Sequence, residues 1–283
     1  MPSPSAVAVV TDSTAYLPPS LAERHGLIVV PLQIAVGGTT RDEGDMSTAE
    51  AALALKEWHP VTTSRPAPER FARAYETAAS SGARHIVSVH LSSALSGTVE
   101  AARLAARDAP VPVTVIDSAT IGLGLGFAAL SAASEALSGG TAESAASAAV
   151  RRAGLTRSLI YVDTLEHLRR GGRIGAAANL LGSALMVKPL LDIADGRIAP
   201  LEKVRTSSRA LARLEELAVA EAGDRRVDLG IQHLAASSRA EALAARLRER
   251  IPHVEDVYVG EVGPVIGAHV GPGMLGVVVA PQL

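Results

Sequence analysis

A hydroxyl-rich segment, Leu-Ser-Gly-Thr at 95–98, lies where a predicted helix begins directly after a predicted buried strand at 85–93. Free backbone N–H groups gather there with the hydroxyl groups of Ser96 and Thr98 at the positive end of the helix, which suits an anion. The alternative is a capped helix in which Gly97 only permits close packing. Gly-Lys is absent from the whole chain, so a Walker phosphate loop is excluded.

Three predicted strands end in an aspartate followed by a hydroxyl residue, at Asp12, Asp117 and Asp163. In open α/β sheets, ligands bind at the carboxyl ends of the strands, so these side chains are candidates for a binding site. The alternative is that each aspartate caps the element that follows it. The sequence leaves both interpretations open.

Two glycine-containing runs are also ambiguous. The run at 124–129 matches the dinucleotide fingerprint by its letters, but Gly124 lies seven residues after Asp117 instead of in the turn after the strand, so helix packing explains it better. The Arg-Arg-Gly-Gly-Arg run at 169–173 is either a mobile anion-binding loop or a solvated turn with arginines at a helix end.

Several kinds of chemistry are excluded by the residue types. The chain has no cysteine, which removes disulfides, thiolate metal sites and thiol nucleophiles. Its eight histidines have no metal-binding spacing and no calcium loop is present, so we do not expect a metal site. Because the dinucleotide fingerprint is misplaced and a phosphate loop is excluded, we do not expect a cofactor either. No Gly-x-Ser-x-Gly elbow exists, although a Ser/His/Asp set assembled from distant positions stays possible.

The first half of the chain alternates between strand and helix patterns. An acidic or hydroxyl residue follows several of the strands, and 62–66 is predicted to be a break between two helices. This alternation predicts a parallel sheet covered on both faces. The predicted strands are 7–11, 27–34, 85–90 and 113–117, and the predicted helices are 19–25, 47–58, 68–79, 97–109 and 122–137.

The second half has a different order, which begins after a break at 154–158. Asp195-Gly196 is a strong two-residue hairpin signal between strands at 186–193 and 197–204, so this sheet is mixed. The predicted fold class is α/β, with an N-terminal domain at 1–156 and a C-terminal domain at 157–283. The other predicted strands are 159–163, 227–233, 254–259 and 276–279, and the helices are 208–221 and 239–250.

Composition limits the partners. The 283 residues carry a net charge of -2 with no basic stripe, and aromatic residues make up 2%, so a nucleic-acid partner is not expected. The chain starts without a basic leader and contains no apolar run long enough to span a membrane. We therefore expect a cytoplasmic protein.

Seven short motifs follow one another over nearly the whole chain. They are Thr-Asp-Ser-Thr at 11–14, Thr-Ser-Arg-Pro at 63–66, Leu-Ser-Gly-Thr at 95–98, Val-Ile-Asp-Ser at 115–118, Gly-Gly-Arg-Ile at 171–174, Arg-Thr at 205–206 and Ala-His-Val-Gly-Pro-Gly at 268–273. In their order and spacing, these motifs resemble the bacterial DegV family.

The resemblance implies two α/β domains that grip one long-chain fatty acid between them, and the best-understood members resemble the fatty-acid-binding subunit of bacterial fatty acid kinase. Such a protein binds the fatty acid and presents its carboxylate to a separate ATP-dependent kinase subunit for acyl-phosphate formation, with no turnover of its own and at most transient membrane contact.

The resemblance also implies roles for individual residues. Thr63 and Ser96 would donate hydrogen bonds to the carboxylate, with His269 close by. A carboxylate only accepts hydrogen bonds, so hydroxyl donors suit it. The resemblance places Arg173 and Arg205 near the pocket mouth or the kinase-facing surface.

One position departs from the family pattern. Arg65 stands where the family usually has Gln, and this extra cation could pair with the ligand, reach solvent or change the preferred partner. From another class, the alternative function is a small-molecule hydrolase or a nucleotide-dependent transferase that uses a non-sequential Ser/His/Asp site.

Overall fold

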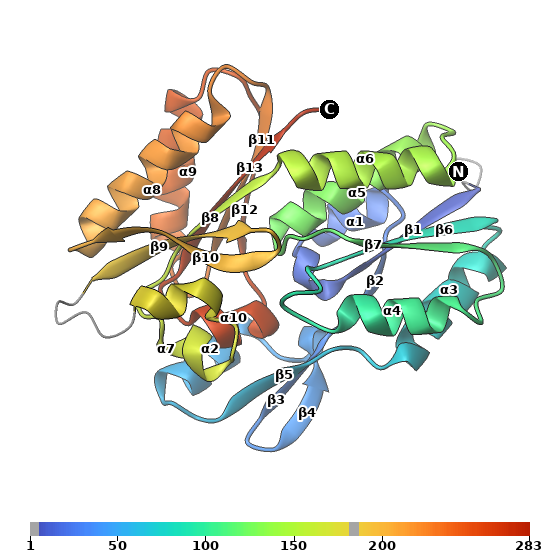
Figure 1. Cartoon of the computed structure of the whole chain (residues 1–283), viewed down its shortest axis with the longest axis horizontal. Helices are drawn as coiled ribbons and strands as arrows, with labels where there is room; N and C mark the ends of the chain where they lie inside the picture. The colour runs from blue at the N-terminus through green and yellow to red at the C-terminus, as the bar shows by residue number, and fades with distance from the viewer. Residues whose placement is uncertain (1–5, 181–186) are drawn as a thin grey trace. The chain divides into compact units, whose positions relative to one another are not determined.

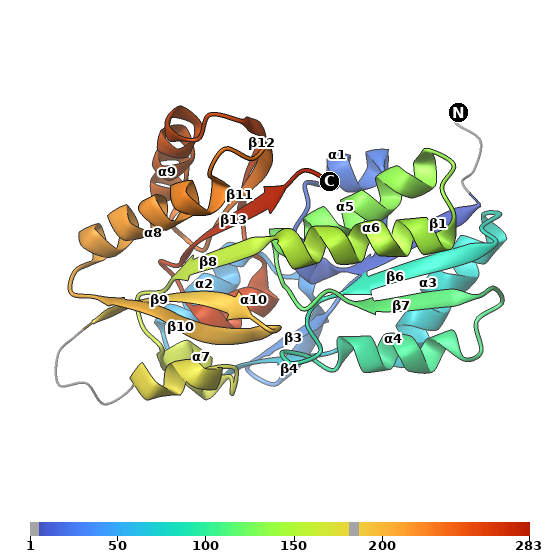
Figure 2. The ribbon, with the colours of Figure 1, turned by 45° about the horizontal axis from the view of Figure 1, so that its top comes forward.

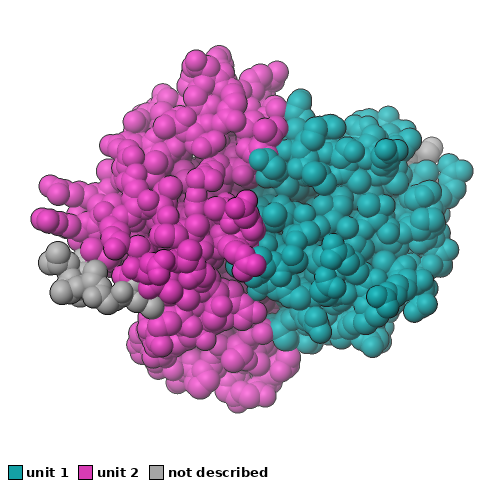
Figure 3. All heavy atoms as spheres, viewed as in Figure 1, with its two compact units in different colours: residues 1–33, 64–154, 283 teal, residues 34–63, 155–282 magenta. Residues whose placement is uncertain are grey.

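The computed structural model describes residues 6–180 and 187–283 (Figure 1). Contacts divide the chain into two compact units, which Figure 3 distinguishes by colour. Unit 1 comprises Met1–Gln33, Ser64–Gly154 and Leu283, and unit 2 comprises Ile34–Thr63 and Leu155–Gln282. The expected boundary between 156 and 157 lies beside this division, but the segment 34–63 groups with the C-terminal half of the chain.

Unit 1 is built on a four-stranded sheet in the order β2-β1-β6-β7. Its strands all pair in parallel, as the sequence predicted. The β-branched residues of its strands fill both faces, and Val10, Val87 and Val89 are fully buried. The strands are β1 (Val7–Asp12), β2 (Ile28–Val30), β6 (His85–His90) and β7 (Val113–Asp117). The helices are α1 (Pro19–Arg24), α3 (Pro68–Ser80), α4 (Thr98–Ala106), α5 (Leu123–Leu137) and α6 (Ala142–Leu155).

Helices cover both faces of this sheet (Figure 2). On one face, α3 and α4 pack through a cluster that contains Phe71 and Tyr75. On the opposite face, α5 packs with small residues, and a Cβ atom at Gly126 would lie 2.8 Å from the carbonyl oxygen of Ala15. Helix packing therefore accounts for this glycine, so the fingerprint letters at 124–129 do not mark a dinucleotide site.

Unit 2 contains a six-stranded mixed sheet in the order β10-β9-β8-β13-β11-β12, in which only β11 and β12 pair in parallel. The helices α8 (Ser207–Ala222) and α9 (Ser237–Arg250) bury their apolar faces in one core cluster with this sheet. The strands are β8 (Arg157–Tyr161), β9 (Lys188–Ala194), β10 (Arg197–Val204), β11 (Val227–His233), β12 (Val254–Glu261) and β13 (Leu275–Pro281).

The hairpin between β9 and β10 turns at Asp195 and Gly196, whose φ angles of 48° and 73° are both left-handed. This pair of positive φ angles matches the twist of the two strands and confirms the hairpin prediction. The predicted strand at 186–193 begins at Met186, which lies outside the described residues.

Shorter elements of unit 2 surround the site described below. The segment 34–63 forms most of a small sheet in the order β4-β3-β5, together with the helix α2. Two more short helices, α7 and α10, contact each other. These elements are β3 (Gln33–Val36), β4 (Thr39–Asp42), α2 (Thr48–Lys56), β5 (Val61–Ser64), α7 (Glu166–Arg170), the 3-10 helix η3 (Gly175–Leu180) and α10 (Pro264–Val270). A further 3-10 turn, η2 (Glu43–Asp45), precedes α2.

One predicted strand is divided in the structure, and two other predicted segments differ in detail. The strand predicted at 27–34 ends at Val30 and a second strand starts at Gln33, because Pro31 has no N–H group to continue the pairing. The predicted break at 62–66 does separate the helices α2 and α3, but most of the strand β5 lies within it, since Val61, Thr62 and Thr63 favour extended backbone. The strand predicted at 159–163 is β8, which starts and ends two residues earlier.

Candidate functional site

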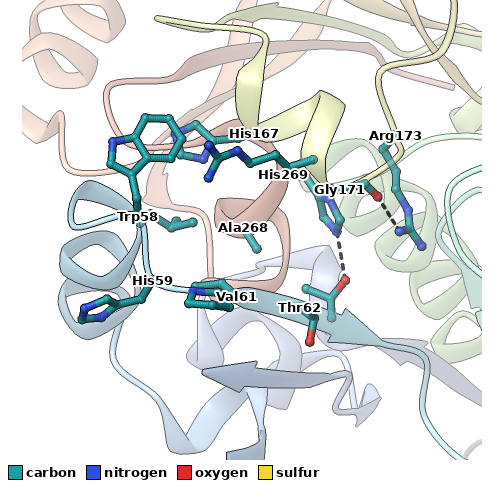
Figure 4. Close-up of a pocket in the computed structure, with 13 residues that line it drawn as sticks. Trp58, His59, Val61, Thr62, His167, Gly171, Arg173, Ala268 and His269 are labelled. Atoms are coloured by element: carbon teal, nitrogen blue, oxygen red, sulfur yellow. Dashed lines mark hydrogen bonds between the residues drawn. The ribbon is translucent and has the colours of Figure 1, made fainter. Parts of the chain in front are cut away.

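A pocket of about 370 Å³ lies within unit 2, between the end of α2, the strand β5, the end of α7 and the helix α10 (Figure 4). Its lining combines apolar side chains with a concentration of basic and aromatic groups. Thr63 and His269, both implied by the family resemblance to meet the ligand head group, are part of this lining. The other lining residues are Leu55, Trp58, His59, Pro60, Val61, Thr62, His167, Arg170, Gly171, Arg173 and Ala268.

Thr63 and His269 meet although 206 positions separate them in the sequence. The hydroxyl oxygen Oγ1 of Thr63 lies 2.9 Å from Nε2 of His269 (Figure 4). Thr63 is held by the extended strand β5, and His269 by the almost entirely buried helix α10. Two residues that the resemblance assigned to one head-group site are therefore in direct contact.

Hydrogen bonds fix the segment 34–63 against the elements that carry His269. The buried side chain of Glu43 accepts a hydrogen bond of 2.9 Å from the backbone N–H of Val265, which lies in the first turn of α10. Thr48, the first residue of α2, donates a bond of 2.6 Å to Glu261 at the end of β12. These bonds link η2 and α2 to α10 and β12, and so explain why the segment groups with unit 2.

The imidazole of His269 is packed against the backbone at the end of α7. A Cβ atom at Gly171 would lie 2.0 Å from Nδ1 of His269, so only glycine leaves room for the ring. This Nδ1 atom is buried and has no hydrogen-bond partner among the described residues. The guanidinium of Arg173 bonds to the carbonyl oxygen of Gly171 at 2.7 Å, which fixes the same turn (Figure 4).

Burial of the ring and, to a smaller extent, the positive charge of Arg173 lower the pKa of His269 from 6.5 to about 4. The ring is therefore neutral near pH 7. A neutral imidazole beside a hydroxyl group can position a proton, whereas Arg173 supplies the fixed positive charge nearby.

At the other end of the pocket, the ring of Trp58 stacks on His167 with a centroid distance of 5.1 Å and an interplanar angle of 5°. The guanidinium carbon of Arg170 lies 4.4 Å from the centroid of the Trp58 ring, within cation–π range. His167 and Arg170 are three positions apart on α7 and so share one face of it. Burial of the ring and, to a smaller extent, the positive charge of Arg170 lower the pKa of His167.

Sequence reasoning missed this aromatic cluster. Trp58 is the only tryptophan in the chain, but its left-handed φ of 57° and its partners on α7 leave no local sequence signal. The run at 169–173 did mark the right region. Its structure agrees with the second interpretation, because Arg169 and Arg170 end α7 and both pair with Glu166 at 2.6 and 2.8 Å.

Ser96 and Arg65 belong to unit 1. Ser96 precedes α4, and its hydroxyl lies 2.8 Å from the hydroxyl of Thr98. The side chain of Arg65 packs against the N-cap residue Gly97, where a Cβ atom would lie 2.7 Å from Nη1. The segment nominated as an anion site therefore carries two hydroxyl groups and an adjacent guanidinium.

Arg205 is exposed between β10 and the N-cap of α8. In the described parts of the chain, no hydrogen bond or ion pair to its side chain is formed. It is therefore available to another molecule, which fits the pocket-mouth or partner-facing role that the resemblance implies.

The structure also contains a Ser/His/Asp chain, in the interior of unit 1. Asp12 Oδ2 lies 3.1 Å from Nδ1 of His90, whose Nε2 lies 2.6 Å from Oγ of Ser88. All three side chains are 0% exposed, and the hydroxyl of Tyr75 covers Ser88 at 2.9 Å. No substrate can reach this serine, so the set does not support the hydrolase alternative.

The aspartates at strand ends are also structural. Asp12 accepts hydrogen bonds from the backbone N–H groups of Thr14 and Leu91. Asp117 accepts from the N–H groups of Ser93 and Ala119. Asp163 accepts from the hydroxyl of Tyr161 and from Lys188. The capping interpretation therefore describes Asp12 and Asp117.

Neither a metal cluster nor a membrane span is found in the part of the chain that the structure describes. Residues 6–180 and 187–283 contain no group of three or more His, Asp or Glu side chains arranged to hold a metal ion. No helix within these ranges is long and apolar enough to cross a membrane.

Comparison with known proteins agrees with the resemblance. A sequence model described as uncharacterised proteins of the DegV family matches residues 6–282. A DegV domain-containing protein of Streptomyces coelicolor is 58% identical over 277 residues, which cover 98% of this chain and 99% of the relative.

Two solved structures extend the comparison to the fold. A fatty-acid-binding DegV family protein of Thermus thermophilus matches with a TM-score of 0.92 and 34% identity, covering 98% of this chain and 99% of that one. DegV of Bacillus subtilis, a fatty acid binding protein, matches with a TM-score of 0.90 and 33% identity, covering 98% and 100%. The expected fold class, with a parallel N-terminal sheet and a mixed C-terminal sheet, is confirmed.

Proposed function

Because this chain belongs to the DegV family, we propose that it binds a long-chain fatty acid and presents the carboxylate to a separate ATP-dependent kinase in the cytoplasm. The observation that carries the binding function is the contact between Thr63 and His269 in a fold shared with two fatty-acid-binding relatives. On this proposal the protein is a carrier and has no turnover of its own.

The head-group site consists of Thr63, Ser96 and His269. The hydroxyl groups of Thr63 and Ser96 donate to the carboxylate, which needs donors because it carries only acceptors. Arg65 packs beside the segment of Ser96 and adds a positive charge there. This makes ligand pairing the preferred role for the arginine that replaces the usual glutamine.

The tail supplies most of the binding free energy. Each methylene group moved out of water contributes about 0.8 kcal/mol, so a long acyl chain far exceeds the few hydrogen bonds of the head group. The chain is 48% hydrophobic and 2% aromatic, a composition suited to a narrow aliphatic wall. The head-group contacts then fix the orientation and register of the fatty acid.

The kinase step needs a second protein. In that step a carboxylate oxygen attacks the γ-phosphorus of ATP, the bond from this phosphorus to the ADP oxygen breaks, and the products are an acyl phosphate and ADP. The chain lacks a Gly-Lys phosphate loop, so the partner brings the nucleotide. Arg173 and Arg205 are the candidate residues for the pocket mouth and the partner-facing surface.

Mass spectrometry of the organic extract of purified protein tests the binding function. We expect a long-chain fatty acid in a ratio near one per chain. An extract without any fatty acid, together with no uptake of added palmitic acid, contradicts the proposal.

The kinase step is tested separately by trapping acyl phosphate with hydroxylamine. Loaded protein with ATP alone should give no hydroxamate, and addition of the partner kinase should produce it.

A further inference from the structure

We infer that His269 is held as its neutral Nε2–H tautomer and that this tautomer makes Thr63 a hydrogen-bond donor toward the ligand. The identity of that ligand as a carboxylate rests on the proposed function. The proton arrangement itself rests on the surroundings of the imidazole ring and can be measured without any ligand.

The surroundings of Nδ1 determine which nitrogen carries the proton. Nδ1 is buried and has no hydrogen-bond partner in the described parts of the chain. The backbone of Gly171 lies directly against it. A proton on Nδ1 would leave a buried N–H group without an acceptor, whereas an unprotonated Nδ1 leaves only an acceptor without a donor. Buried N–H groups without an acceptor are the rarer of the two in folded proteins. The proton of the neutral ring therefore lies on Nε2.

The same argument excludes the charged ring, because an imidazolium carries protons on both nitrogens. Arg173 bonds to the carbonyl oxygen of Gly171 and so places a positive charge beside the ring. Burial and this charge lower the pKa of His269 to about 4. Near neutral pH, His269 therefore has one donor, which faces Thr63.

The tautomer of His269 fixes the direction of the hydrogen bond to Thr63. A threonine hydroxyl has a single hydrogen atom and accepting lone pairs. When Nε2–H donates to Oγ1 over the observed 2.9 Å, the hydroxyl hydrogen of Thr63 stays free for another acceptor. In the opposite tautomer the hydroxyl would donate to Nε2, and Thr63 could only accept from a ligand. Only the Nε2–H tautomer suits an acceptor-only carboxylate.

This arrangement makes His269 a positioning residue that determines head-group specificity. A donor fixed by its neighbour favours an ionised carboxylate, because a charge-assisted hydrogen bond is roughly twice as strong as a neutral one. A fatty alcohol gains only the neutral bond. Replacing His269 by alanine frees the hydroxyl of Thr63 to rotate, so it can accept from an alcohol as well as donate to an acid.

Nitrogen-15 NMR of the ligand-free protein, labelled in its histidine side chains, tests the tautomer directly. The His269→Gln variant identifies the His269 signals by their absence. We expect a protonated Nε2, an unprotonated Nδ1 and no change of this pattern between neutral pH and about pH 5. A protonated Nδ1, or an imidazolium at neutral pH, overturns the inference whether or not the protein binds fatty acid.

Ligand discrimination tests the consequence for specificity. Affinities for palmitic acid and cetyl alcohol are measured with wild type, His269→Ala and His269→Gln. We expect the preference of the wild type for the acid to fall about tenfold in His269→Ala, in line with the loss of one hydrogen bond to a charged group. His269→Gln, whose amide can donate near the position of Nε2, should restore part of the preference. An unchanged preference in His269→Ala contradicts the inference, whereas failure of the wild type to bind palmitic acid contradicts only the proposed function.

Discussion

On the proposed function, the hydroxyl group of Thr63 is one of the donors to the head group of the ligand. Within the described structure its side chain bonds only to His269. We predict that Thr63→Val and Ser96→Ala each weaken fatty-acid binding about tenfold or more, since each leaves the carboxylate short of one donor at about 1.5–3 kcal/mol. Neither change opens a large cavity, so both variants should fold. The thermal midpoint of the ligand-free protein should stay unchanged in Ser96→Ala and fall slightly in Thr63→Val, because valine removes the acceptor of the Nε2–H group of His269.

Calorimetric titration with palmitic acid and thermal unfolding of ligand-free protein check this prediction together. Thr40→Val is the matched control, because Thr40 is exposed on β4. Unchanged affinity with a lowered thermal midpoint would show that Thr63 and Ser96 only stabilise local structure.

The low pKa of His269 also predicts a pH dependence of stability. The unfolded chain takes up a proton on this ring below about pH 6.5, whereas the folded protein takes it up only near pH 4. More protons are bound by the unfolded state in this window, so lowering the pH favours unfolding. The contribution of His269 to this loss is about 3 kcal/mol over the whole window.

Urea unfolding at a series of pH values between 7 and 4 measures the effect, with His269→Gln as the control that cannot titrate. The wild type should lose more stability than the variant as the pH falls. Parallel curves for the two proteins would mean that His269 binds its proton equally well in both states.

At the level of elements, the contact between the end of α7 and α10 keeps His269 in place. Gly171→Ala should displace the imidazole, because the new Cβ atom would lie 2.0 Å from Nδ1 and backbone flanks it on α7. We predict a loss of fatty-acid affinity of at least tenfold, comparable to the loss of a charge-assisted hydrogen bond. Gly260→Ala on β12 is the control, because open space surrounds its Cβ position. Equal affinities of both variants would show that the ring adapts without cost.

In unit 1, the buried chain of Asp12, His90, Ser88 and Tyr75 joins β1, β6 and α3. Burial raises the pKa of Tyr75 to about 12, so its hydroxyl stays protonated and bonded to Ser88. Ser88→Ala leaves Tyr75 and His90 each short of a partner and should lower the free energy of unfolding by about 1–3 kcal/mol.

Denaturant unfolding measures this loss. Ser80→Ala, an exposed change at the end of α3, is expected to stay within about 0.5 kcal/mol of wild type. A measurable esterase activity that disappears in Ser88→Ala would instead revive the hydrolase interpretation.

Across the whole chain, the sequence predicts the fold better than it predicts the site. The alternation of strands and helices is a local signal, and it predicts the parallel sheet of unit 1 correctly. The Asp195-Gly196 turn is also local, and it predicts that the sheet of unit 2 is mixed. The contact between Thr63 and His269 is not local, and only the family resemblance brings the two residues together. The space that Gly171 leaves for the ring of His269 depends on how α7 and α10 pack. The stacking of Trp58 on His167 depends in the same way on how α2 and α7 pack, and no spacing in the sequence encodes either arrangement.

The last prediction concerns the partner protein. Arg205 is exposed and forms no ion pair within the described residues, so its charge is available for an encounter with the proposed kinase partner. We predict that Arg205→Ala retains bound fatty acid but slows acyl-phosphate formation, because a charge at the rim of an interface mainly affects encounter and docking.

Arg197→Ala is a suitable control, because Arg197 is an exposed arginine at the opposite end of β10. Fatty-acid affinity and the initial rate of hydroxamate formation with the cognate kinase are measured for both variants. A slower rate in Arg205→Ala alone, restored by raising the kinase concentration, assigns Arg205 to the docking surface. Equal losses of affinity and rate would instead place Arg205 at the ligand itself.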